Sequence, residues 1–230
     1  MTARDLPTHG FSPPEFFELL RPDERAALEA AGRRQRYPRD AVIFREGSTS
    51  ASVIIVLSGR VKVSSDTASG TEVVLAVRGP GALLGELSAI DGGPRSATVT
   101  ALEPVTALAV PSADFEQHLL DHGRTAFVLM RELTRRLRDA DRKRIEFGAF
   151  DTTGRVAARL VELADRFGEP TDDGLRIDLP LSQDELAGWT GASREAVTKA
   201  LRILRQEGWI QTGRMRVVIT DLDALKRRSQ

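Results

Sequence analysis

Two helix starts lie close together in residues 182–204, which read SQDELAGWTGASREAVTKALRIL. The first is a capping box, because Ser182 can accept from the backbone three residues on while Glu185 reaches back to the cap. Residues 190–192 (Thr-Gly-Ala) then make a short turn, and Ser193 can cap a second helix. A helix, a short turn with glycine and a second capped helix are the helix-turn-helix pattern.

The second helix has an apolar face and a polar face. Its apolar side chains fall at helical spacing and point to a core: Val197, Ala200, Leu201 and Leu204. On the other face, basic side chains can donate to guanine and a glutamate can accept from cytosine. An ion pair between Glu195 and Lys199 on a solvated helix is the alternative. The basic hairpin expected over residues 209–219 favours DNA contact, because it is typical of a winged helix. The predicted DNA-binding residues are Ser193, Arg194, Glu195, Thr198, Lys199, Arg202 and Arg214.

Short β-branched runs fill residues 41–110 and are separated by glycine-containing turns. The runs are 42–44, 53–57, 61–63, 72–77, 97–101 and 105–110. Many short strands separated by glycine-containing turns predict an antiparallel roll or barrel.

A long helix is expected over residues 124–147, after a short one that Ser112 is expected to cap. Its apolar side chains alternate at spacings of four and three, with Arg144 interrupting the seam: Ala126, Met130, Leu133, Leu137, Ala140 and Phe147. This seam indicates a two-helix contact in a homodimer, although the helix can also pack on its own β-domain. We therefore predict an α+β chain with an N-terminal part, 1–123, a dimerisation helix, 124–150, and a winged helix-turn-helix, 151–230, whose first helix is capped by Asp151.

Residues 84–99, LGELSAIDGGPRSATV, form the most unusual stretch within the β-rich part. Its glycines let backbone N–H groups approach a ligand, and the arginine and serine that follow suit a phosphate. Glu86 suits a sugar hydroxyl instead. The stretch is therefore interpreted as a site for a phosphorylated sugar or as a surface hairpin whose arginine pairs with a carboxylate.

Composition excludes several classes of site. The chain has no cysteine and only three histidines, so cysteine-ligated clusters are excluded and a metal site is not expected. No nucleophile–base pair is evident, and an enzyme is not expected. Without a signal peptide or a membrane span, the protein is expected in the cytoplasm, away from membranes. Net charge is zero, but positive charge gathers in residues 131–146 and 191–216, as local contacts to anions require.

In this order, the motifs resemble the cyclic AMP receptor protein/FNR (Crp/Fnr) family of bacterial transcription regulators, and actinobacterial members look most similar in the C-terminal part. The matching stretches are 43–47, 57–63, 81–87, 94–98, 151–157 and 191–197. The resemblance implies that Glu86 binds a ribose hydroxyl and that Arg95 binds a cyclic phosphate, with no covalent cofactor. The implied ligand-binding residues are Gly85, Glu86, Leu87, Arg95, Ser96, Ala97 and Asp141.

The family's base-reading pair on the long helix falls here on Ala140 and Asp141. Ala140 has no polar side-chain atom, and an ionised Asp141 can only accept. The expected function is a DNA-binding transcription regulator switched by a cyclic nucleotide, with cAMP as the first candidate. The alternative is a ligand-independent regulator or one that senses another small molecule. The resemblance also implies a palindromic operator with TGTGA-like half-sites in double-stranded DNA, and contact with RNA polymerase.

Overall fold

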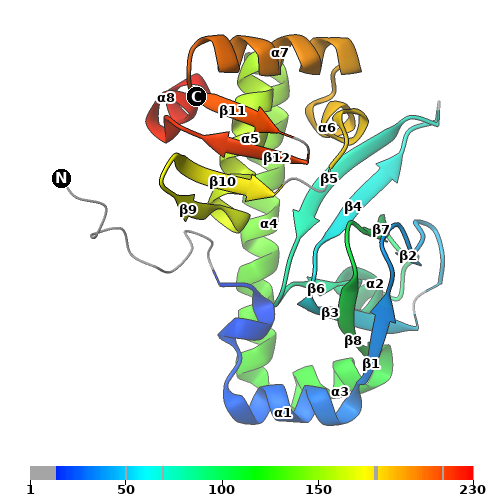
Figure 1. Ribbon diagram of the computed structural model, residues 1–230. Coiled ribbons are helices and arrows are strands. Elements are labelled where there is room, and N and C mark those ends of the chain that lie inside the picture. Colours follow the sequence, from blue (N-terminus) through cyan, green and yellow to red (C-terminus); the bar gives the residue numbers. More distant parts are fainter. Residues whose placement is uncertain (1–13, 50, 69, 179–180, 214, 230) are drawn as a thin grey trace. The chain divides into compact units, whose positions relative to one another are not determined.

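The computed structural model describes residues 14–49, 51–68, 70–178, 181–213 and 215–229 (Figure 1). It divides into two compact units, an N-terminal unit, Pro14–Lys143, and a C-terminal unit that begins at Arg144. The dividing point lies within one helix, α4 (Gly123–Ala149). The domain boundaries expected from the sequence stay predictions, and each unit is described separately below.

The N-terminal unit is a β-roll with helices before and after it. It contains η1 (Phe16–Leu19), α1 (Pro22–Ala31), β1 (Arg33–Tyr37), β2 (Val42–Phe44), β3 (Ser52–Ser58), β4 (Val61–Asp66), β5 (Glu72–Arg78), β6 (Leu83–Leu84), α2 (Glu86–Asp91), β7 (Thr98–Ala101), β8 (Val105–Pro111), α3 (Ser112–Asp121) and most of α4. The strands form two antiparallel sheets, ordered β1-β8-β3-β6 and β2-β7-β4-β5.

Strand β3 explains how the roll is layered. Val53 and Ile55 pack with η1, α1, α3 and α4 on one face of the first sheet. Ile54 and Val56 pack on the other face, in a core shared with the second sheet. Because successive strand residues point to opposite faces, a strand buried on both sides must be apolar throughout, as this run is.

The C-terminal unit is a winged helix. It contains α5 (Thr152–Phe167), β9 (Glu169–Thr171), β10 (Gly174–Asp178), α6 (Gln183–Thr190), α7 (Arg194–Gln206), β11 (Ile210–Gly213), β12 (Arg216–Ile219) and α8 (Leu222–Arg228). Its sheet has the order β11-β12-β10-β9, all antiparallel. The Asp151 carboxylate caps α5 by accepting from the Gly154 N–H at 2.8 Å, so that expected cap is confirmed.

Several local expectations were wrong or incomplete. Pro111, not Ser112, precedes α3, and Ser112 is the first helical residue. Strands β1 and β9 lie outside the runs that the sequence predicted as strands. The stretch 84–99 contains the short helix α2 between two glycines with left-handed backbone conformation, Gly85 and Gly92. Among the described residues, no helix combines the length and the apolar character that crossing a membrane requires.

Candidate functional site

Arg95 lies almost fully buried within the predicted phosphate site. Its Nη1 donates to the Gly85 carbonyl at 2.8 Å and to the Ser88 hydroxyl at 2.9 Å, and its Nη2 donates to the Ser52 carbonyl. A guanidinium has five N–H donors. Nε is buried and finds no acceptor among the described residues. The site therefore holds a desolvated cation with an unused donor, which is the requirement for binding an anion.

Electrostatics at Arg95 also favour an anionic partner. Burial lowers the pKa of Arg95 from its usual value, and the nearby Glu86 carboxylate partly opposes this. An anion that approached Nε–H would compensate the cost of burying the charge.

Gly85 is required by the backbone conformation and by the arginine beside it. Its φ is +77°, a left-handed conformation that favours glycine. A Cβ at this position would lie 2.1 Å from Nη1 of Arg95. The glycine therefore lets the guanidinium approach the start of α2, and the predicted close approach of the backbone to a ligand stays a prediction.

Glu86 begins α2 and is 4% exposed. Its Oε1 accepts from Nη1 of Arg136, on α4, at 2.8 Å. Arg136 also donates to the Leu83 carbonyl at 2.8 Å, so one side chain joins the long helix to both β6 and α2. Sequence reasoning missed Arg136 and Ser88. The only available signal for Arg136 was the cluster of basic residues over 131–146.

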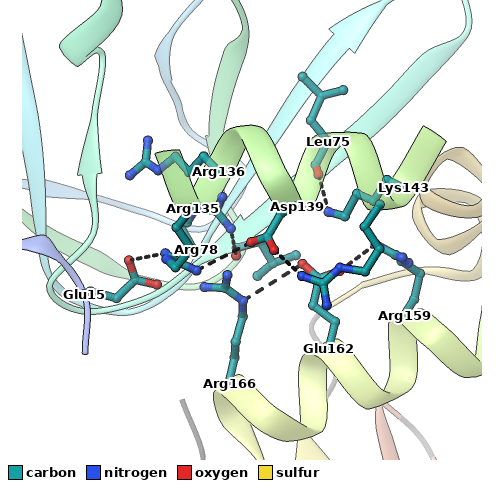
Figure 2. Close-up of polar contacts among 12 residues, drawn as sticks. Glu15, Leu75, Arg78, Arg135, Arg136, Asp139, Lys143, Arg159, Glu162 and Arg166 are labelled. Atoms are coloured by element: carbon teal, nitrogen blue, oxygen red, sulfur yellow. Dashed lines mark hydrogen bonds and ion pairs between the residues drawn. The ribbon is translucent and has the colours of Figure 1, made fainter. Parts of the chain in front are cut away.

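A chain of ion pairs on α4 supports Arg136. Glu132 is buried and accepts from Arg136 at 2.8 Å and from Arg135 at 2.7 Å. Burial alone would raise the pKa of Glu132, but these two arginines hold it below its usual value. Arg135 also lies 3.7 Å from Glu15 and 3.6 Å from Asp139 (Figure 2). The polar face of α4 is thus fixed to the roll around the Glu86 site.

The remaining predicted ligand residues differ in their exposure. Leu87 and Ser96 are exposed, and the Ala97 side chain is buried. Asp141 is exposed on α4, five residues after Arg136. Since a helix turns about 100° per residue, Ala140 lies on the Arg136 face and Asp141 is rotated about 140° from it.

The helix pair of the C-terminal unit has the caps that the sequence predicted. Ser182 and Glu185 form the capping box at the start of α6, with bonds of 3.1 and 2.7 Å. The helix ends before Gly191, whose φ of +58° makes the turn. Ser193 then accepts from the Ala196 N–H at 3.2 Å and starts α7.

Helix α7 presents its polar face to solvent. Val197, Ala200 and Leu204 are buried, and Leu201 is half-buried, in agreement with the predicted inward face. The predicted DNA-binding residues on this helix and its cap are exposed: Ser193, Arg194, Glu195, Thr198, Lys199 and Arg202. The Glu195 carboxylate accepts from its own backbone N–H and from the Ser193 hydroxyl, which lowers its pKa. Glu195 is therefore held as an acceptor at the start of α7.

Strands β11 and β12 form the expected hairpin next to α7. Arg205 on α7 donates to the Thr212 hydroxyl on β11 at 3.2 Å. Arg216 is exposed at the start of β12. Arg214, predicted at the tip, lies outside the described residues. The recognition face of α7 and the wing thus belong to one folded unit.

Comparisons with known proteins identify a family for each of the two parts of the chain. A family model described as "Cyclic nucleotide-binding domain" matches residues 34–122, and one described as "Crp-like helix-turn-helix domain" matches residues 154–228. A "CRP-like cAMP-activated global transcriptional regulator" of Mycobacterium tuberculosis is 35% identical, over 94% of this chain and 96% of that protein. The "Cyclic AMP receptor protein" of Thermus thermophilus is 32% identical, over 86% of this chain and 88% of that protein.

A solved structure has the same fold. The c-di-GMP responsive global regulator CLP of Xanthomonas campestris superposes with a TM-score of 0.74 at 25% identity, covering 86% of this chain and 98% of that chain.

Proposed function

The chain belongs to the Crp/Fnr family of transcriptional regulators, and from this premise we propose that cAMP, bound at Arg95 and Glu86, switches its affinity for DNA. Members of the family regulate transcription and are not enzymes. The observation that carries the proposal is the buried Nε–H of Arg95, which has no acceptor within the described part of the chain, beside the left-handed Gly85. A cyclic phosphate supplies the missing acceptor, and a ribose hydroxyl can donate to Glu86.

The choice of cAMP among cyclic nucleotides is supported by two relatives whose names state that they respond to it. In this chain, Arg95 and Glu86 offer charged partners for a phosphate and a ribose, whereas Ala140, the one of the two implied base-reading residues on the Arg136 face of α4, offers no polar side-chain atom. The adenine base therefore depends on backbone, on Asp141 or on a second copy of the chain for hydrogen bonds.

DNA binding is proposed to use the exposed face of α7 in a homodimer. Helix α4 exposes three large apolar side chains in one chain: Phe127 (59%), Met130 (55%) and Leu137 (63%). A second α4 would cover them. Two recognition helices one DNA turn apart read a palindromic operator, for which TGTGA-like half-sites are the first candidate. The proposed place of action is the cytoplasm, with RNA polymerase as the further partner.

Isothermal titration with cAMP, cGMP and c-di-GMP tests the effector. We expect heat of binding with cAMP, and we expect Arg95→Ala to remove it because the phosphate loses its buried donor. Arg60→Ala is the control, since Arg60 pairs with Glu103 elsewhere on the roll at 2.7 Å. Binding of c-di-GMP alone would show that another nucleotide is the effector, and no heat at millimolar cAMP would contradict the proposal.

A further inference from the structure

Phe44, at the end of β2, covers one face of the Arg95 guanidinium. The Cζ atom of Arg95 lies 4.3 Å from the centre of the phenyl ring. This distance is within the range of a cation–π contact, which is strongest where the cation is shielded from water. Arg95 is 5% exposed, so the ring faces a desolvated cation.

The segment that carries Phe44 also holds the Arg95 backbone. The Gly47 N–H donates to the Arg95 carbonyl at 2.8 Å, and the Arg95 N–H donates to the Ser48 carbonyl at 2.9 Å. Residues 44–48 therefore fix both the main chain and the plane of the guanidinium.

Three acceptors and the Phe44 ring together determine which N–H groups of Arg95 can still bind a phosphate. The carbonyls of Gly85 and Ser52 and the Ser88 hydroxyl take three of the five N–H groups, and the ring covers a face that offers no donor. The N–H donors that remain, including Nε–H, lie in the plane of the guanidinium itself. We propose that Phe44 is a positioning residue for the effector phosphate, acting through Arg95.

This inference rests on the proposed function, in which Arg95 binds the phosphate of cAMP. The ring is needed because Glu86 lies close enough to attract the same guanidinium. Without the ring, Arg95 can leave the plane that the phosphate requires, and binding must then restore it. The expected cost appears as weaker affinity for cAMP, while the fold of the roll stays intact.

The test compares three variants by cAMP titration and by the NMR resonance of the Arg95 Nε–H group, assigned through its loss in Arg95→Lys. Phe44→Leu should weaken cAMP binding about 5- to 30-fold and should remove the ring-current shift of Nε–H. Phe44→Tyr keeps the ring face and should restore both. Ile43→Val is the matched control, because Ile43 packs against the same core while the ring contact with Arg95 comes from Phe44, and it should bind cAMP within about twofold of the parent chain.

Two results would overturn the inference. One is Phe44→Leu with parental affinity and an unchanged Nε–H resonance. The other is equal weakening in Phe44→Leu and either Phe44→Tyr or Ile43→Val, which would show a packing effect only. If the parent chain binds no cAMP, the proposed function fails, and the Nε–H resonance still decides whether Phe44 positions Arg95.

Discussion

Arg95 and Glu86 carry opposite charges, and each is stabilised in a different way. Glu86 has a cationic partner in Arg136, whereas the acceptors that Arg95 contacts among the described residues are neutral and its guanidinium lies over an aromatic ring. A ligand with an anionic group next to a hydroxyl can satisfy this asymmetric pair. At the residue scale, the chain therefore favours a cyclic phosphate with a neighbouring ribose hydroxyl over a ligand with either group alone.

His118, on α3, gives the N-terminal unit a pH dependence. Burial and the stacked His122 ring lower its pKa below 6.5, while Glu24 and Asp121 act in the opposite direction. The unfolded chain then binds the proton first as pH falls, so stability decreases below about pH 6.5. The free energy of unfolding, measured in urea at pH 7.5 and 5.5, should fall more for the parent chain than for His118→Gln. Equal decreases would contradict this prediction.

Glu195 should contribute specificity at one base pair. Its side chain is exposed at the start of α7 and can accept from cytosine N4. Glu195→Ala should reduce discrimination at that position by about 1–3 kcal/mol, as measured by binding to single-base operator variants. Glu207→Ala, an exposed glutamate at the other end of α7, should keep the parental preference. Identical preferences in all three proteins would place base reading elsewhere.

Among the helices and strands, the sequence predicted the features that neighbouring residues determine and missed those that depend on contacts with distant residues. The caps at Ser182 and Ser193 were predictable because each uses residues within one helical turn. Strand β1 was missed because most of its side chains are polar and exposed, and its pairing partner β8 lies far along the chain. Helix α2 has only six residues, too few for a helical period to show. Arg136 was missed because its partner Glu86 is 50 residues distant.

Helix α4 divides its apolar side chains between two faces. Val128 and Leu129 are buried in the roll core, whereas Leu137 is 63% exposed. Packing of the helix on the roll is confirmed at its start, where the seam residue Leu133 also contacts the core, and the two-helix contact stays a prediction. If a second copy covers the exposed face, Leu137→Glu places a charge there and should shift sedimentation from dimer to monomer. Arg138→Glu, on the neighbouring exposed position, should remain dimeric, and a dimer in both variants would contradict the proposed interface.

The proposed effector site and the proposed DNA-binding face belong to different units of the molecule. Coupling between them must be reciprocal, because a ligand that raises DNA affinity must itself bind more tightly in the presence of DNA. The proposed switch therefore works if cAMP favours the state in which a dimer presents both α7 helices to DNA.

The most direct measurement is fluorescence anisotropy of a palindromic duplex, selected by the protein from random DNA, titrated with and without saturating cAMP. We predict that cAMP tightens DNA binding by about 5- to 150-fold and that Arg95→Ala binds weakly in both conditions. The same DNA affinity with and without cAMP, in a protein that binds the duplex specifically, would contradict the proposed switch.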